Sequence, residues 1–277
     1  MNKILFIVTI CVVLFTGCST KIEVDRKVGQ LNLESAKLKQ EKPVDNVIAI
    51  VSPSISLPKK ENKNQQIQQF PLGFYQPTRT STQFDADNTF SSNYKDRLNQ
   101  ALESSITEIL SAKGFKLKGP YSHLEDMTYQ DKKQVYLAFV PKIDFRIDNK
   151  STKTIPERLY TRTEGVIQIS GSFTISIQEP ITGQVFLNRR INLSDFNISE
   201  PYIYEVQHST GDGTITGAAF DKATAPDLIT DTTDVALTKA INQFYSKAIE
   251  RINSFIDREE ILSFEKDINQ LKDLKRY

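Results

Sequence analysis

The chain has 277 residues, with 35 Lys and Arg against 34 Asp and Glu, which gives a formal net charge of +1. So balanced a charge argues against non-specific nucleic-acid binding and against a polybasic patch for anionic membranes. Both cysteines lie within the first 18 residues, so the rest of the chain offers no thiol for a disulfide, a thiolate metal site or a cysteine nucleophile.

The N-terminus has the layout of a secretory signal. Met1-Asn2-Lys3 precedes an apolar segment, Ile4 to Phe15, that is too short to span a bilayer. Thr16-Gly17-Cys18 follows, and its two small residues before a cysteine resemble the bacterial lipobox. We therefore expect a lipoprotein signal peptide over residues 1–17 and a lipid anchor, with acyl chains such as palmitate, on Cys18.

An ordinary signal peptide that ends in cysteine, or an uncleaved N-terminal anchor, is the alternative interpretation. Phe15 occupies a position where the lipobox most often has Leu, Val or Ile. Ser19 differs from the Asp that retains enterobacterial lipoproteins in the inner membrane, so this residue favours the outer membrane. Beyond residue 15 no apolar run approaches the ~20 residues that a spanning helix needs.

Polar and charged residues dominate the segment after the lipobox, and residues 18–43 are predicted to form a lipidated N-terminus and polar tether. Val47 to Val51 is a short apolar run between prolines, which indicates a buried strand. Residues 58–91 are polar and rich in Gln and Asn, so we expect an irregular insertion there.

A long helix is predicted after Ser91-Ser92-Asn93, whose side chains can cap it, because apolar residues then recur every three to four positions up to Gly114. Phe115 to Lys118 alternates as a strand, so this region predicts a βαβ-like unit. A further short helix is expected over Asp126 to Lys133.

The middle of the chain carries the strongest strand signals. Val135 to Val140 is apolar throughout and predicts a central strand, which Ile143 to Ile147 continues by alternation. Glu164 to Gln178 alternates apolar and polar residues, and a turn at Pro180 to Gly183 leads into a returning strand, Val185 to Leu193. These two strands predict a long antiparallel hairpin with one buried face.

Residues 205–233 are rich in Thr, Gly, Ser and Asp, and a flexible loop is expected over Ser209 to Thr214. The remaining chain is expected to contain a long helix capped by Asp234 and a C-terminal amphipathic helix from about Glu259 to Leu274. Together these elements predict one α+β domain over residues 44–277. Its mixed, mainly antiparallel sheet of about five strands is covered on one face by two long helices.

Few residues suggest chemistry. Lys150, Lys153, Arg158 and Arg162, with Tyr160 among them, can contact a carboxylate or sugar hydroxyls, although a mobile basic loop is the simpler interpretation. Phe70 to Tyr75 offers either an aromatic contact patch or core packing.

No catalytic or metal site is predicted. His123 and His208 lack metal-ligand spacing, Gly211-Asp212-Gly213 lacks the context of a phosphate loop, and no G-x-S-x-G motif occurs. The acidic pairs Glu125-Asp126 and Glu259-Glu260 are expected on solvated helix faces. We therefore expect neither an enzyme nor a bound cofactor.

Several short matches give the chain a resemblance to the neuraminyllactose-binding haemagglutinin lipoproteins of the Helicobacter and Campylobacter group over Asn93 to Tyr277. The matching segments are Tyr94-Lys95, Ile109-Leu110, Gly114-Phe115-Lys116, Tyr136-Leu137-Ala138, Glu164-Gly165-Val166, Glu179-Pro180-Ile181-Thr182-Gly183, Leu193-Ser194, His208-Ser209, Lys266-Asp267 and Leu271-Lys272.

The resemblance implies an outer-membrane or flagellar-sheath lipoprotein, exposed on the cell surface, that acts as an adhesin for sialylated host glycans. The sialic-acid segment described for the family falls near residues 148–153, where Lys150, Thr152 and Lys153 match it in type and Ser151 replaces an arginine. The alternative is a structural envelope or flagellar-sheath lipoprotein that acts through protein–protein contacts, as a homo-oligomer or with envelope proteins.

Overall fold

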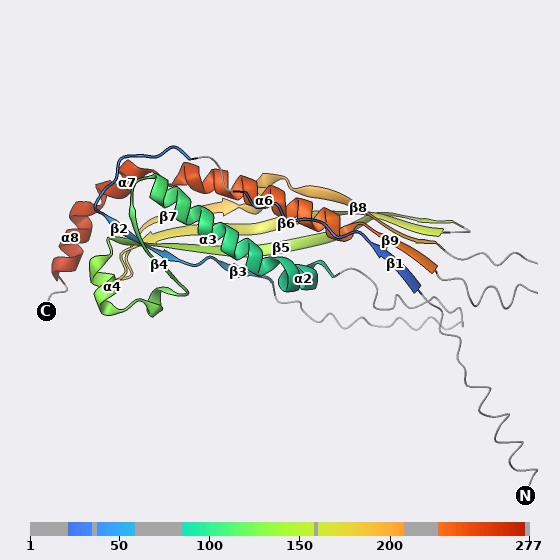
Figure 1. Ribbon diagram of the computed structural model, residues 1–277, viewed down its shortest axis with the longest axis horizontal. Helices are drawn as coiled ribbons and strands as arrows, with labels where there is room; N and C mark the ends of the chain where they lie inside the picture. Colours follow the sequence, from blue (N-terminus) through green and yellow to red (C-terminus); the bar gives the residue numbers. More distant parts are fainter. Residues whose placement is uncertain (1–21, 35–37, 59–84, 158–159, 208–226, 275–277) are drawn as a thin grey trace, which may run out of the picture.

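The computed structural model describes residues 22–34, 38–58, 85–157, 160–207 and 227–274. They form an elongated molecule in which long strands run parallel to two long helices (Figure 1). The fold is α+β with a mixed sheet, as predicted. No helix in these residues is long and apolar enough to cross a membrane.

The described residues contain nine strands in one sheet, in the order β1-β9-β8-β6-β5-β2-β4, with β3 beside β5 and β7 beside β6. The prediction of about five strands was therefore wrong. The strands are β1 Ile22–Arg26, β2 Val47–Val51, β3 Ser54–Ser56, β4 Lys116–Tyr121, β5 Leu137–Pro156, β6 Tyr160–Gln178, β7 Val185–Asn192, β8 Ser199–Gln207 and β9 Asp227–Asp231.

Antiparallel pairing of β5 with β6 forms the middle of the sheet, and β7 and β8 pair with successive parts of β6. The predicted hairpin of β6 and β7 is thus confirmed. Strands β2 and β4 are parallel and are joined through a helix, which confirms the βαβ unit. Parallel pairs also join β2 and β3 to β5, and β1 to β9.

No strand was predicted over residues 199–231, where the structure has β8 and β9. The flexible loop predicted over Ser209 to Thr214 lies outside the described residues and stays a prediction. Residues 205–207 belong to β8, and β9 and the first residue of a helix fall within 227–233. Residues 208–226, which include Gly211-Asp212-Gly213, lie outside the described residues. The short, polar strands β8 and β9 are ordered by pairing with each other and with distant strands, which local sequence does not reveal.

Two long helices, α3 (Lys95–Ala112) and α6 (Thr233–Phe255), lie along the sheet in Figure 1. A short α2 (Ala86–Thr89) and a π-helical turn η1 (Phe90–Tyr94) precede α3 without a break. The smaller helices are η2 Leu124–Asp126, α4 Tyr129–Gln134, η3 Leu193–Phe196, α7 Arg258–Ser263 and α8 Glu265–Leu274.

Helix boundaries correct two predictions and confirm a third. The first long helix begins before Ser91, because the Asp85 side chain caps α2 by accepting from Asn88 N at 3.1 Å. The predicted C-terminal helix is two helices, α7 and α8, which meet at Phe264. The predicted end at Gly114 is confirmed, since this glycine has a φ of +88° just after α3.

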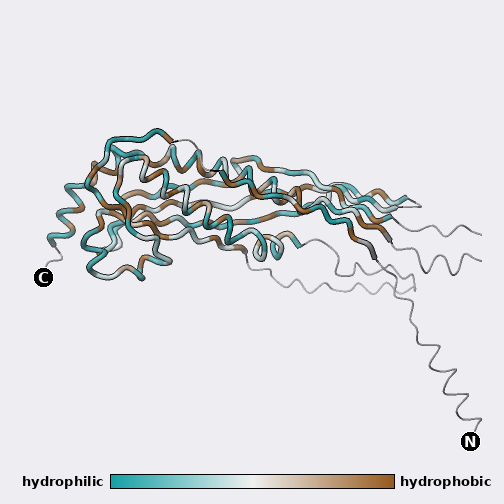
Figure 2. The backbone as a smooth tube through the Cα atoms, viewed as in Figure 1, coloured by the Kyte–Doolittle hydropathy of each residue, from teal (hydrophilic) through white to brown (hydrophobic). Residues whose placement is uncertain are grey.

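The main core lies between the helices and one side of the sheet, which we call the helix face. On β6, the alternating residues Ile167, Ile169, Phe173, Ile175 and Ile177 are all buried, as the sequence pattern predicted. In Figure 2 apolar and polar colours change repeatedly along these strands. The period-2 pattern therefore assigns one face of the hairpin to the core.

Aromatic contacts join the elements around this core. The Phe145 ring on β5 stacks on Phe90 of η1 with centroids 4.9 Å apart, and it meets Phe244 of α6 edge-on at 5.0 Å. Such pairs add to the free energy of apolar burial. The π-helical turn, the central strand and the second long helix thus share one packing centre.

Residues 22–34 pack along the body, which differs from the polar tether expected there. Strand β1 pairs with β9, and Gly29 N donates to the Asp234 carboxylate at 2.9 Å. Farther along, Asn32 N donates to the side chain of Asn242 at 2.9 Å. These bonds involve the backbone, so even a polar sequence can be held against the body.

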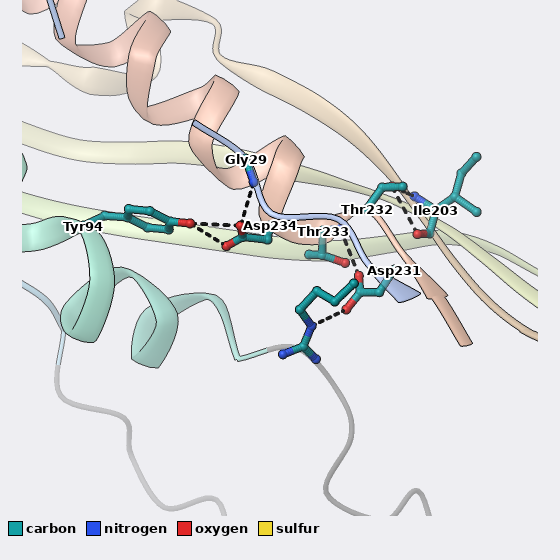
Figure 3. Close-up of polar contacts among 8 residues, drawn as sticks. Gly29, Tyr94, Ile203, Asp231, Thr232, Thr233 and Asp234 are labelled. Atoms are coloured by element: carbon teal, nitrogen blue, oxygen red, sulfur yellow. Dashed lines mark hydrogen bonds and ion pairs between the residues drawn. The ribbon is translucent and has the colours of Figure 1, made fainter. Parts of the chain in front are cut away.

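The prediction that Asp234 caps the helix α6 was wrong. Thr232 holds the N-cap position, and Asp234 lies buried in the first turn of α6. Figure 3 shows Tyr94 and Gly29 meeting at its carboxylate. The Tyr94 hydroxyl reaches its two oxygens at 2.8 and 2.9 Å. Burial, followed by the nearby Asp234, raises the pKa of Tyr94.

We expect Tyr94→Phe to lower the free energy of unfolding by about 1.5–3 kcal/mol, because it removes a hydrogen bond to a buried charged group. Tyr245→Phe is the matched control, since the Tyr245 hydroxyl pairs with the neutral Ser105 at 2.6 Å in the same helix interface. Urea unfolding at unchanged slope measures both losses. A loss at Tyr94 no larger than the loss at Tyr245 would contradict a stabilising role for the carboxylate.

Candidate binding face of the sheet

Beyond Val140 of β5, where a small apolar cluster of Ala49, Met127, Val135 and Ala138 ends, the side of the sheet away from the two long helices is mainly polar. On β5, Ile143 and Phe145 are buried on the helix face, whereas the alternating Lys142, Asp144 and Arg146 are exposed on the other side. We call this second side the open face. It comprises Lys142, Asp144, Arg146, Asp148 and Lys150 on β5, Gln168, Ser170, Ser172, Thr174 and Ser176 on β6, and Asn188, Arg190 and Asn192 on β7.

Strand register arranges the open face in rows, because directly opposed residues of neighbouring strands point to the same side. One row across β7, β6, β5 and β3 is Arg190, Thr174, Lys142 and Ser54. The next row is Asn192, Ser172, Asp144 and Ser56. The rows place hydroxyl and amide groups beside cationic side chains.

Serine hydroxyl groups donate hydrogen bonds to the carboxylates of this face. Asp144 accepts from Ser56 Oγ at 2.6 Å and from Ser172 Oγ at 3.4 Å. Asp148 accepts from Ser170 Oγ at 3.0 Å. These bonds hold the acidic groups in place without using a lysine or an arginine.

The lysine and arginine side chains of the same face differ from these carboxylates in their partners. Lys142, Arg146 and Arg190 are exposed, and none of them forms an ion pair with another described residue. Their charge is therefore available to an anionic ligand. Charge-assisted hydrogen bonds from such groups are stronger than those between neutral groups.

The predicted residues Lys150, Thr152 and Lys153 lie in the last part of β5, where we had expected an irregular or mobile loop. Lys150 Nζ donates to Gln168 Oε1 at 3.1 Å, and Thr152 Oγ1 donates to the Glu164 carbonyl at 3.1 Å. The expected loop was wrong because cross-strand pairing with β6 continues through this polar sequence.

A β-bulge brings the two lysines to the same side. Lys150 is opposite Val166 and Lys153 is opposite Glu164, with a register shift between Ser151 and Lys153. In a regular strand, residues three apart point to opposite faces, so the extra residue restores Lys153 to the open face. Both lysines therefore lie on the same side of β5 as the charged residues that alternate along this strand from Lys142.

Other predicted positions do not gather into a site. Arg162 pairs with Glu164 at 2.9 Å, and Glu260 binds Arg189 at 3.0 Å instead of pointing freely into solvent. The backbone N of His123 donates to Asp126 Oδ2 at 2.8 Å within η2. No group of three or more His, Cys, Asp or Glu suited to a metal occurs among the described residues.

Several predicted residues lie outside the described part of the chain. They are Cys18, the aromatic segment Phe70 to Tyr75, Arg158 and His208. The signal peptide of residues 1–17 and most of the insertion at 58–91 also fall there. The roles expected for them stay predictions.

A cavity of about 520 Å³ lies between η3 and the second half of α6. Lys247 and Arg251 line it together with Asp195 and Glu250, so cations and carboxylates balance. Lys247 Nζ also donates to the Phe196 carbonyl. Its cations are thus less available to an anion than those of the open face.

A family model for the neuraminyllactose-binding hemagglutinin precursor matches residues 80–275. The chain belongs to this family. The matched segment contains β5, β6, β7 and both long helices, and therefore most of the open face. The family resemblance drawn from the short sequence matches is confirmed.

Two curated relatives, the neuraminyllactose-binding hemagglutinins of Helicobacter pylori strains 26695 and J99, are each 24% identical over 199 residues. Each alignment covers 68% of this chain and 74% of the relative. These proteins are named as hemagglutinins and not as enzymes.

The fold also has a solved counterpart. The crystal structure of a Helicobacter pylori protein described as a neuraminyllactose-binding hemagglutinin homolog superposes with a TM-score of 0.52 at 14% identity. The match covers 85% of this chain and 99% of that chain. At this identity the likeness shows a shared fold.

Within this family member, sequence reasoning missed Lys142, Arg146 and Arg190. A usable signal was present, because residues 142–150 alternate Lys, Asp, Arg, Asp and Lys with mainly apolar residues. The pattern predicts a charged strand face. Only the register with β7 adds Arg190 to it.

Gly171 supports the close pairing of β5 and β6 beneath this face, and we expect Gly171→Ala to disturb it. Its φ is +119°, and an added Cβ would lie 2.0 Å from the Asp144 carbonyl oxygen. The expected loss of stability is about 1–3 kcal/mol from the backbone conformation alone, with the clash in addition. Gly183→Ala is the control, because Gly183 also has positive φ but its added Cβ meets no atom within 4 Å. Thermal unfolding that ranks the two variants equally would contradict this account.

Proposed function

We propose that this chain is a lipid-anchored, non-enzymatic adhesin of the outer membrane that binds sialylated glycans on the open face. The observation that carries the proposal is the presence of exposed cations beside hydroxyl and amide rows in a member of a family named for neuraminyllactose binding. Lys150, Thr152 and Lys153 extend this surface toward the end of β5, where β5 pairs with the beginning of β6.

The chemistry of the face suits such a ligand. A sialylated glycan combines one carboxylate with many hydroxyls, so it needs a cation together with polar donors and acceptors. Lys142 and Arg190 supply the cations, and Thr174 lies between them in the same row. The open face carries four cations, Lys142, Arg146, Lys150 and Arg190, against the two carboxylates of Asp144 and Asp148, so its net charge attracts an approaching carboxylate.

The membrane part of the proposal is supported by the sequence. The lipobox-like Thr16-Gly17-Cys18 follows a short apolar segment, and acyl chains contribute ~0.8 kcal/mol per buried CH₂ group. Two or three chains hold a protein on a membrane without a spanning helix. A surface position is what the name of the family suggests for an adhesin.

Sialyllactose should bind the protein in which Cys18→Ser prevents lipidation, and lactose should not. The double variant Lys142→Ala/Arg190→Ala should bind at least about tenfold more weakly, because each 1.4 kcal/mol of lost charge-assisted contact is a factor of ten. The double variant Lys150→Ala/Lys153→Ala tests the part of the open face at the end of β5. Titration calorimetry measures all of them.

The matched control is Lys239→Ala/Lys266→Ala, which also removes two cations from exposed positions on α6 and α8. Equal affinity for lactose and sialyllactose would refute recognition of sialic acid. A loss of binding in the control as large as in the open-face variants would refute the assigned site.

Lipidation predicts a second result. Cells grown with labelled palmitate should incorporate the label into the wild-type protein and not into Cys18→Ala, which should leave the membrane fraction. Protease added to intact cells should cut the anchored protein. Failure of Cys18 to carry label, or full protection of the protein on intact cells, would contradict an anchored surface adhesin.

A further inference from the structure

The first described strand begins at the same end of the sheet as the β5–β6 hairpin. Ile22 is opposite Asp227, the next residue of β9 is opposite Gln207, and Gln207 is opposite Tyr160 at the start of β6. Figure 1 shows these strand ends together, far from α4, α7 and α8. We call them the free end of the sheet.

This beginning of β1 is held in place. Along its length β1 pairs with β9, and just after it Lys27 N donates to the Asp231 carbonyl at 3.1 Å. The Arg26 side chain contacts the buried Asp231 carboxylate at 3.3 Å, and Gly29 is bound to Asp234. The position of Ile22 therefore follows the body of the protein.

Only four peptide links join Cys18 to Ile22, so their Cα atoms are at most ~14 Å apart in any conformation. By contrast, β5 has 20 residues and a length of ~66 Å at ~3.3 Å per residue. A lipid on Cys18 would thus be much closer to the free end than to the opposite end of the molecule.

From these distances we infer that the free end of the sheet faces the membrane surface, with the long axis directed away from it. This inference rests on the proposed lipidation of Cys18. The ends of β1, β9, β8, β6 and β5 are the part of the described sheet nearest to the lipid headgroups. Helices α4, α7 and α8 occupy the outer end.

Charge gives the character of this contact. Near the free end the described strands carry the cations Arg26, Lys150, Lys153 and Arg162 against the acidic residues Glu23, Asp25, Glu157, Glu164, Glu205 and Asp227. A surface without an excess of cations gains little from anionic lipids, which attract basic segments. The partner is therefore a headgroup surface of either charge, and the anchor supplies the binding energy.

The inferred orientation places one end of the open face closer to the membrane than the other end. Lys150 and Lys153 lie nearest the membrane, whereas Lys142 is eight residues earlier than Lys150 on β5, ~26 Å farther out. Arg190 lies in the same row as Thr174 and Lys142. A glycan on another cell would meet Lys142 and Arg190 before the hairpin lysines.

Single-cysteine labelling of the full, lipidated protein in vesicles tests the orientation, because Cys18 is acylated and no other thiol remains in the mature chain. Donor dyes on Thr154→Cys, Arg146→Cys and Asp267→Cys report energy transfer to an acceptor lipid at the membrane surface. All three positions are exposed. They lie at the free end, in the middle of the open face and on α8.

The efficiency of energy transfer should fall in the order Thr154, Arg146, Asp267. The efficiencies at Thr154 and Asp267 should differ at least about twofold, since most of the length of β5 separates these positions. The order should be the same in zwitterionic vesicles and in vesicles with anionic lipid. Equal transfer at all three positions, or the reverse order, would overturn the inference. A gradient that appears only with anionic lipid would overturn the proposed headgroup contact.

Two controls separate the inference from the proposed anchor. Insertion of about 20 Gly and Ser residues between Ser19 and Thr20 should flatten the gradient, because a flexible linker of that length spans roughly 25 Å. Vesicle flotation tests the anchor itself. Protein that floats without a gradient keeps the anchor and refutes the orientation, whereas wild-type protein that fails to float refutes both.

Discussion

The pairing of β5 with β6 is the interaction on which the other elements depend. Both strands alternate apolar and polar residues, and their register places the two apolar sets on one side. That side must be covered, and α3 and α6 cover it. The remaining strands attach to this pair, with β7 and β8 along β6 and with β2 and β3 along β5. The same alternation leaves the opposite side polar, so the core and the candidate binding face have one origin.

The buried Asp234 carboxylate links the N-terminal segment to this scaffold. It accepts from Gly29 N and from the Tyr94 hydroxyl, so residues before β2, the π-helical turn and α6 meet at one group. A buried charge without such partners would be strongly unfavourable. Its hydrogen bonds therefore do more than stabilise a helix start, because they fix the segment that leads from the proposed anchor.

The candidate site and the proposed orientation share one axis. The open face follows β5 from Lys142 to the bulge beyond Lys150, and the same strand ends at the free end beside β1. A surface that runs away from the membrane offers several contacts to an extended glycan instead of a single deep pocket. Individually weak contacts of this kind suit adhesion, where many copies act together.

The sequence by itself determined the α+β class, the βαβ unit, the β6–β7 hairpin and the family, because local periodicity and short motifs carry that information. It failed for β1, β8, β9 and the end of β5, whose polar residues are ordered by hydrogen bonds to neighbouring strands of the sheet. The alternation of charges on β5 was readable in the sequence, but the bulge that aligns Lys150 with Lys153 and the row that adds Arg190 were not. Register and bulges are set by hydrogen bonds between strands and are not visible in the alternation within one strand, so only the tertiary structure decided which charges share a face.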